Sequence, residues 1–408
     1  MRTMILLLWL ALSPGDSLSV MFWNVENFFD WRNDSTTVSD AEFSAAGERH
    51  WGWKKFQAKA NAFAKALFWV EGETGRLPDV VGLAEVENSF VLRQVLTKTA
   101  LRKTDYKYVH YDSPDRRGID VALLYRTTVL ELVDSKPCHL YAADSLMATR
   151  DILLCVFKRA TPGSSSVTPG TSSAIPGPPS VAPGSSSVIP GLTGNLPLDG
   201  LKMAEQVGHD GKESAFAVLV NHHPSKYGGA AESEPRRRIA VERLRFLADS
   251  LVAVGIDRII ACGDFNDTPA NPVFRLLEPA LVPMHMDLYR HGLGTIKYDG
   301  QWDLIDHFYV SPALESPSLA SPSPPLSASL SSSLASPSTS PSPALASPSP
   351  SGSPPSAYAR MRILRIPFLL TRDTAHSGEK PLRTFQGPRV LGGVSDHLPI
   401  LLEVTFPP

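Results

Sequence analysis

The chain has 408 residues, with 39 Lys or Arg against 41 Asp or Glu, and its formal net charge is −2. This near balance excludes a protein that holds nucleic acid over its whole surface by charge alone. The 3 cysteines exclude a disulfide framework, because Cys155 and Cys262 fall within apolar runs and are expected to be small core residues.

Residues 1–17 have the pattern of a secretory signal peptide, because Arg2 is followed by about nine apolar residues and then by small residues. The apolar run is too short for a membrane-spanning helix. We therefore expect a secreted or periplasmic protein that is cleaved close before Ser17 to Val20. The alternative is that this segment is a buried first strand.

Apolar periodicity predicts strands and helices that interleave along the rest of the chain. Residues 53–70, for example, carry apolar side chains at helical spacing, from Phe56 to Phe68. The predicted order is strand 18–24, helix 53–70, strand 79–84, helix 88–100, strands 106–111, 119–126, 151–157 and 214–221, helix 239–252, strand 258–263, a short helix 271–278, and strands 304–310, 361–366 and 398–405. This alternation predicts the α/β or α+β class.

Two stretches interrupt this pattern, 161–200 and 312–357. The first has a loose repeat of Ser, Val, Pro and Gly, and the second is almost entirely Ser, Pro, Ala and Leu. Each has a single charged residue, Asp199 or Glu315, and no periodicity, so we expect disordered or extended insertions in surface loops. The remaining chain, within 18–408, then forms a single domain. The alternative is that the two tracts are glycosylated or bind a partner.

Polar residues stand where the predicted strands end or begin. In chain order they are Asn24, Glu85, His222, Asp264 with Asn266, Asp306, and Asp396 with His397. Each alone could be a turn residue, and Asp264 with Asn266 could form an Asx turn before Thr268. A set of strand ends that carries only Asn, Glu, His and Asp indicates instead a converging site for a hard metal ion.

In this order the motifs WNVEN (23–27), GDFND (263–267) and SDHLP (395–399) resemble those of the endonuclease/exonuclease/phosphatase superfamily. The segments NHHPSKYGG (221–229) and GIDVALLYR (118–126) are most similar to secreted bacterial members of the nuclease or phosphodiesterase type. The resemblance implies two packed mixed β-sheets flanked by helices, the four-layer DNase I-like sandwich. It also implies a site at one edge, where the strands of both sheets end.

The resemblance further implies a divalent ion, Mg²⁺ with Mn²⁺ or Ca²⁺ as alternatives. Such an ion prefers one or two carboxylates, with water and substrate oxygens as its other ligands. Glu85 is the expected metal ligand. Asn24 would lie beside it and bind the ion's water or a phosphate oxygen. Asp396 is expected to be a further metal ligand or to support one.

Phosphate ester hydrolysis also needs an activated water and a donor to the phosphoryl oxygens. Asp264 is expected to activate the water, and Asn266, two residues on, to orient it. His397 would donate a hydrogen bond to the phosphoryl group, with Asp306 holding its ring and raising its pKa. His222 is expected to be a second imidazole that binds phosphate or acts as an acid.

Substrate contacts are predicted in the loop that follows His222, at Lys226 and Tyr227. A basic cluster at Arg236–Arg238, continued by Arg243 and Arg245, could also contact phosphates. The alternative for this cluster is a solvated helix face paired with neighbouring glutamates.

Together these features predict a metal-dependent phosphodiester hydrolase, a secreted endonuclease acting on DNA or RNA. The alternative is a phosphodiesterase or phosphatase of the same fold that acts on a phospholipid headgroup or an inositol phosphate. A catalytically inactive binding protein is the third hypothesis, and the complete set of polar residues argues against it. We expect a monomer with nucleic acid as substrate, no stable protein partner and no transmembrane span.

Overall fold

The computed structural model describes residues 17–33, 41–160, 215–226, 228–315 and 358–405. The predicted signal peptide lies outside these residues except for Ser17, and the predicted insertion 161–200 lies outside them entirely. The second predicted insertion lies outside them from residue 316 onward. Its first residues form a 3₁₀ helix, Pro312–Leu314, with Leu314 buried, so regular structure continues beyond the predicted start of this insertion.

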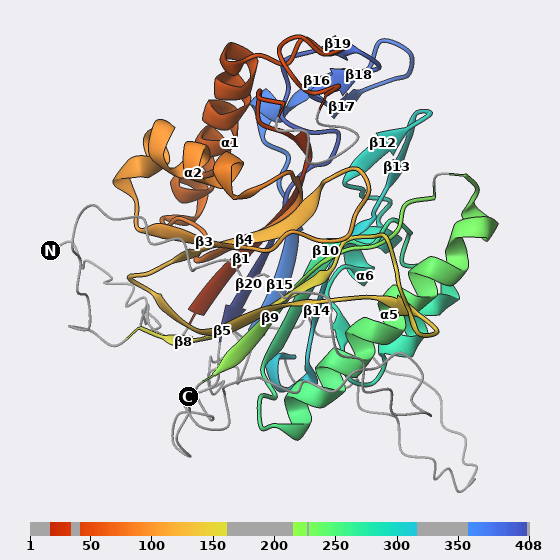
Figure 1. Cartoon of the computed structure of the whole chain (residues 1–408). Helices are drawn as coiled ribbons and strands as arrows, with labels where there is room; N and C mark the ends of the chain where they lie inside the picture. Colours follow the sequence, from red (N-terminus) through yellow and green to blue (C-terminus); the bar gives the residue numbers. More distant parts are fainter. Residues whose placement is uncertain (1–16, 34–40, 161–214, 227, 316–357, 406–408) are drawn as a thin grey trace, which may run out of the picture.

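Six strands form the first sheet, in the order β15-β20-β1-β2-β4-β3 (Figure 1). Their bounds are β1 Ser17–Phe28, β2 Val80–Val86, β3 Tyr106–His110, β4 Asp120–Arg126, β15 Tyr358–Ile363 and β20 Ile400–Thr405. The central strands β1 and β2 are parallel, and all other neighbours in this sheet are antiparallel.

The second sheet also has six strands, in the order β11-β14-β10-β9-β8-β5. Their bounds are β5 Leu130–Cys138, β8 Ile152–Arg159, β9 Phe216–His222, β10 Ile259–Asp264, β11 Val282–Pro283 and β14 Asp306–Val310. Here β9 and β10 are the parallel pair. The mixed sheets that the sequence predicted are therefore confirmed, and each has one parallel pair at its centre.

Helices cover the outer face of each sheet, which gives four layers (Figure 1). Helices α1 (Trp53–Thr74) and α2 (Ser89–Lys98) pack on the first sheet, and α5 (Ala230–Ala253) packs on the second with the 3₁₀ segment Pro272–Leu277. A central apolar core lies between the sheets. The predicted α/β sandwich is thus the observed fold.

Strand β1 shows why the strand predictions succeeded. Val20 and Phe22 point into the core between the sheets, whereas Met21 and Trp23 point toward the helices. Because both faces are covered, the strand is apolar at successive positions and is conspicuous in the sequence. Burial of each large side chain contributes about 1.5–3 kcal/mol.

Several elements differ from the prediction. Strand β15 spans Tyr358–Ile363 rather than 361–366, and β11 and the short hairpins described below were not predicted. Strand β5 was not predicted, because Glu131, Asp134 and Lys136 interrupt its apolar pattern and Pro137 lies within it. A strand at the edge of a sheet tolerates all of these residues, because one of its sides has no neighbouring strand. Helix α5 begins at Ala230 rather than 239, so the basic cluster lies inside the helix.

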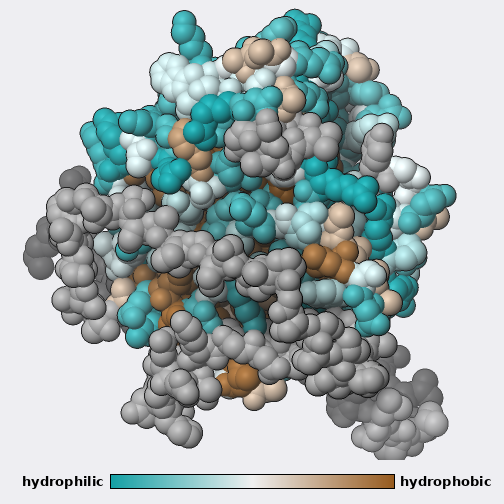
Figure 2. Space-filling model, viewed as in Figure 1, coloured by the Kyte–Doolittle hydropathy of each residue, from teal (hydrophilic) through white to brown (hydrophobic). Residues whose placement is uncertain are grey.

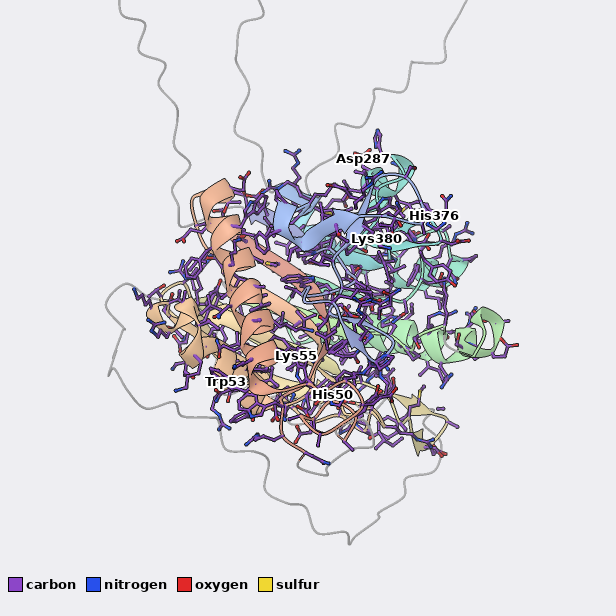
Figure 3. All side chains as sticks on the ribbon, turned by 90° about the horizontal axis from the view of Figure 1, so that it is seen from above. His50, Trp53, Lys55, Asp287, His376 and Lys380 are labelled. Carbon is purple, nitrogen blue, oxygen red and sulfur yellow. The ribbon has the colours of Figure 1, made fainter. Side chains whose placement is uncertain are left out.

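Short elements complete the fold. They are β6 Tyr141–Ala142 with β7 Ser145–Leu146, β12 Ile296–Tyr298 with β13 Gln301–Asp303, β16 Leu370–Arg372 with β17 Glu379–Pro381, β18 Phe385–Gln386 with β19 Arg389–Val390, α6 Met286–Arg290, and 3₁₀ segments Ala100–Lys103 and Pro367–Leu369. Hairpins β12–β13 and β16–β17 meet through Lys297 and Asp373, 3.1 Å apart, beside His376 and Lys380 (Figure 3).

Within the described ranges, no helix combines the length and the apolar character needed to cross a membrane.

Candidate functional site

The structure brings six of the predicted residues together at one edge of the sandwich. Asn24 lies in β1, Glu85 in β2, His222 ends β9, Asp264 ends β10, Asp306 begins β14, and His397 precedes β20. The carboxyl ends of the two parallel pairs meet here, together with the amino ends of their antiparallel neighbours. Five of the six are buried, Glu85 being partly exposed, so their charges interact through little solvent.

His397 and Asp306 form a buried pair. Nδ1 of His397 lies 2.8 Å from Oδ2 of Asp306, which leaves Nε2 to face Asp264. Burial alone would lower the pKa of His397, but the charge and hydrogen bond of Asp306, with further charge from Asp264, raise it well above its usual value. The imidazole is therefore expected to carry a proton at neutral pH.

The main chain around His397 is also fixed. Its N–H donates to Ser395 Oγ at 2.9 Å, and Ser395 Oγ donates to the carbonyl of Asn24 at 2.6 Å. The indole of Trp23 donates to the His397 carbonyl at 2.9 Å. On the other side, Leu398 N–H donates to the carbonyl of buried Thr295 at 2.7 Å. The ring is thus held by contacts with β1 and with the start of the β12–β13 hairpin.

Asp264 lies between the two histidines. Its Oδ2 is 3.9 Å from Nε2 of His397 and 3.6 Å from Nε2 of His222, and it accepts the Asn24 amide at 3.0 Å. Burial raises the pKa of Asp264, His397 lowers it and Asp306 raises it again, and the net result lies above the usual value. A carboxylate with a raised pKa is suited to accept a proton near neutral pH.

Glu85 occupies a bulge in β2, where its φ of 64° is unusual for a residue with a side chain. Oε2 accepts the Asn27 N–H at 2.8 Å, and Oε1 lies 3.3 Å from Nη2 of Arg117. Burial would raise the pKa of Glu85, but Arg117, the Asn27 N–H and His397 lower it below its usual value. Glu85 is therefore ionised at neutral pH, as a metal ligand must be.

His222 faces both carboxylates, since its Nε2 also lies 3.9 Å from Oε1 of Glu85. Its Nδ1 is buried and has no hydrogen-bond partner among the residues that the structure describes. Burial and the nearby charge of Arg150 and Arg117 lower the pKa of His222 well below its usual value. The ring is therefore neutral, and it can offer one N–H as a donor while accepting at the other nitrogen.

Asn266 is both a turn residue and a neighbour of the site. Its φ is 53°, its N–H donates to Asp264 Oδ1 at 2.9 Å, and its amide donates to the His223 carbonyl at 2.9 Å. The Asx turn considered from the sequence is thus present. It orients the Asp264 carboxylate toward the two histidines.

The other predicted residues lie differently. Asp396 pairs with Arg383 at 3.0 Å, and Lys226 pairs with Asp267 at 2.8 Å. Tyr227 lies outside the described residues. Within the basic cluster, Arg237 is buried against Asp267 at 3.3 Å, so this arginine supports the fold rather than forming an exposed phosphate contact.

Sequence reasoning did not find four charged residues beside the site. Arg117 contacts Glu85, and Arg150 donates to the His223 carbonyl at 2.7 Å while pairing with Asp115 at 3.1 Å. Glu26 and Arg383 form a further pair next to Asn24. Arg117 and Glu26 could have been noticed, because each is within three residues of a recognised motif position.

The donor chemistry fits a hard divalent ion. Glu85 supplies an ionised carboxylate, and carboxylate oxygens of Asp264 and Asp306 lie within 4.8 Å of each other and of a ring nitrogen of His397. Oδ1 of Asp306 is buried without a partner. Among the described residues no cysteine lies in this group, which agrees with a preference for oxygen ligands over thiolate.

The fold and the site together define the class of phosphoester hydrolases. The chain matches the Endonuclease/Exonuclease/phosphatase family over residues 19–161 and 202–319, and it belongs to this family. The matched residues include Asp306 but end before His397, so the pairing of His397 with Asp306 is known from the structure alone.

Three of the solved structures that the chain resembles have low sequence identity to it. An endonuclease/exonuclease/phosphatase family protein of Bacteroides thetaiotaomicron shares 15% identity, covering 96% of this chain and 98% of its own, with a TM-score of 0.47. A mannosyl-6-phosphatase of the same species shares 13%, covering 95% and 100%, with a TM-score of 0.46. The human Nocturnin catalytic domain shares 13%, covering 96% and 95%, with a TM-score of 0.46. No curated protein matches the chain significantly.

Proposed function

We propose that the chain is a divalent-metal-dependent phosphodiester hydrolase, and specifically a secreted endonuclease that acts on DNA or RNA. Family membership supports phosphoester hydrolysis. The observation that carries the proposal is the position of Asp264, within 4 Å of both His222 and His397 and bonded to Asn24. Asp264 faces the protonated ring of His397 and the neutral ring of His222. The site therefore has a proton acceptor, Asp264, beside a proton donor, His397.

In this proposal Asp264 accepts the proton of the attacking water. The water oxygen bonds to phosphorus, the phosphorus–ester bond breaks, and the ester oxygen leaves with the electron pair and takes a proton from solvent. The raised pKa of Asp264 matches it to this task near neutral pH. Asn266 keeps the carboxylate oriented throughout, through its N–H bond to Oδ1.

Protonated His397 donates from Nε2 to a phosphoryl oxygen as negative charge develops there, while Asp306 holds its Nδ1. Neutral His222 donates one N–H to a second phosphoryl oxygen. Glu85, with Asn24 beside it, would hold the divalent ion. When bound, such an ion supplies Lewis-acid stabilisation of the phosphoryl charge.

The choice of nucleic acid as substrate rests on the motif wording and on the predicted signal peptide 1–17, not on surface charge. The basic helix α5 could bind the phosphates of either a nucleic acid or the alternative substrate, a phospholipid headgroup or an inositol phosphate. There Arg238 pairs with Glu234, Arg245 pairs with Asp249, and Arg237 is buried, so this helix contributes little charge for a polyanion.

A lipid surface would require an apolar face, and Figure 2 bears on this point. On the face shown, hydrophilic side chains cover most of the described residues, and hydrophobic ones occur in small separate groups. The described part of this face therefore shows no large apolar patch of the kind that a lipid surface would contact. We propose that the enzyme is a monomer without a stable protein partner.

Nicking of supercoiled plasmid by the purified protein, measured with Mg²⁺ and with EDTA, tests the proposal directly. The mature protein should nick the plasmid with Mg²⁺ only, and Asp264→Ala and His397→Ala should each abolish nicking while retaining the circular dichroism spectrum of the parent. Asp287→Ala, an exposed carboxylate of α6, is the matched control and should keep full activity. Cleavage that persists in Asp264→Ala would contradict the site, whereas no cleavage with any divalent ion would move the substrate to a small phosphodiester.

A further inference from the structure

Arg383 joins two carboxylates that belong to different parts of the chain. It lies between β17 and β18, and it pairs with Glu26 near the end of β1. Nε and Nη2 donate to Oε1 of Glu26 at 3.2 and 3.1 Å, and Nη2 also lies 3.0 Å from Oδ2 of Asp396. Glu26 is 2% exposed, whereas the Arg383 side chain is 46% exposed.

Both carboxylates are next to residues of the candidate site. Glu26 follows Asn24 by two positions, and its N–H donates to Asn24 Oδ1 at 2.9 Å. Asp396 directly precedes His397. Arg383 therefore connects the end of β1 with the segment that leads into β20, and these segments carry Asn24 and His397.

Two carboxylates at one point repel each other and require a cation between them. A divalent ion can serve, and so can a guanidinium, whose planar fork offers several donors at once. Here the bonds of Glu26 are already made, because Oε2 accepts Thr384 N–H at 2.6 Å and Oε1 also accepts Phe385 N–H at 3.3 Å. These donors come from the same loop as Arg383, so the loop provides a complete set of partners for this carboxylate.

A second cation stabilises the loop itself. Lys59 of α1 is buried, and its Nζ donates to the Glu26 carbonyl at 2.5 Å and to Thr384 Oγ1 at 2.8 Å. Thr384 Oγ1 in turn donates to the Val394 carbonyl at 2.7 Å. Protein groups thus line the Glu26 side of this position and hold Arg383 there, while the rest of its side chain faces solvent.

We propose that the Arg383 guanidinium takes the place of a second divalent ion, so that the site binds one ion, at Glu85. This inference rests on the proposed metal-dependent function. Arg383 is then a positioning residue, which holds the segments of Asn24 and His397 at a fixed separation. Asp396, predicted from the sequence as a metal ligand, instead serves as the partner of Arg383.

Counting bound Mn²⁺ tests this without any substrate. Equilibrium dialysis with electron paramagnetic resonance of free Mn²⁺ should give one ion for the parent protein, one for Arg383→Lys and two for Arg383→Gln. Arg389→Gln removes an exposed arginine of the nearby β19 and should keep one ion. If Arg383→Gln binds the same number of ions as the parent, the proposal is overturned.

A second variant keeps the test decisive if Arg383→Gln does not fold. Asp396→Asn should bind Mn²⁺ with less than a threefold change in Kd, because the proposal excludes Asp396 as a ligand. Weakening by tenfold or more would overturn the proposal. Glu85→Gln tests the metal site of the proposed function separately, and this variant should lose the bound Mn²⁺. If it binds as many ions as the parent, the metal is not at Glu85. The comparison of the parent with Arg383→Gln would still show whether Arg383 excludes a second ion.

Discussion

Replacing Asp306 with Asn tests the role of the buried pair with His397. The two side chains are almost fully buried, and Nδ1 lies 2.8 Å from Oδ2. Asn has the same shape and can still accept the Nδ1 hydrogen bond, but it carries no charge. A hydrogen bond to a charged group contributes about 1.5–3 kcal/mol, so its weakening should lower kcat by about tenfold to about 150-fold.

The pH dependence has a definite sign. Asp306 raises the pKa of His397, so the protonated ring persists to higher pH in the parent protein. Activity that needs this proton is lost as pH rises through the pKa of His397. In Asp306→Asn that pKa falls, the loss begins at lower pH, and the defect in kcat is largest at alkaline pH.

The assay is steady-state phosphodiester hydrolysis from pH 5 to pH 9 at saturating Mg²⁺, with thermal unfolding followed in parallel. Asp303→Asn is the matched control, because Asp303 is exposed in β13, three residues before Asp306. It should behave as the parent. A fall in kcat of less than threefold with an unchanged pH profile would refute the assignment of Asp306 to His397.

Three further outcomes are expected. Gly263→Ala should destabilise the fold by about 1–3 kcal/mol in urea unfolding, because an added Cβ would lie 2.3 Å from a main-chain oxygen of β9. Gly72→Ala in α1 is the control: its added Cβ meets nothing within 4 Å, and it should stabilise the fold by up to about 1 kcal/mol. Burial lowers the pKa of His285 to about 4, so unfolding takes up a proton below about pH 6.5 and the free energy of unfolding falls on acidification. His285→Gln should reduce the slope of unfolding free energy against pH by about 1.4 kcal/mol per pH unit in this range. An unchanged slope would contradict the argument. Lys226→Ala should raise KM with little change in kcat and should cost at most about 1 kcal/mol in thermal unfolding, since its pair with Asp267 is partly exposed.

The sequence predicted the strands that build the site because these strands are covered on both faces. Their apolar runs are continuous, so the polar residue at each end, such as Glu85 or Asp264, is conspicuous. The same reasoning missed β5, whose edge position allows charged residues and Pro137 within it. It also began α5 too late, because the apolar pattern starts at Ile239 while the helix starts nine residues earlier, at Ala230.

What the sequence could not predict is pairing between distant charges. Arg383 and Glu26 are 357 residues apart, and neither has a local pattern that identifies its partner. Lys59 lies on the buried face of α1, between Phe56 and Phe63, and its Nζ bonds to Thr384. Such pairs depend on which loops the fold brings together, so they appear only in three dimensions.

The hydrogen bond from Trp23 to His397 joins residues 374 positions apart, and residues 17–22 of β1 pair with β20, the last strand described. Strand β1 is central in its sheet, so one of its sides remains unpaired until the end of the chain is available. Contacts this distant form slowly, since a long loop must close first. In a nascent chain the site can therefore be assembled only after His397 and β20 have been synthesised.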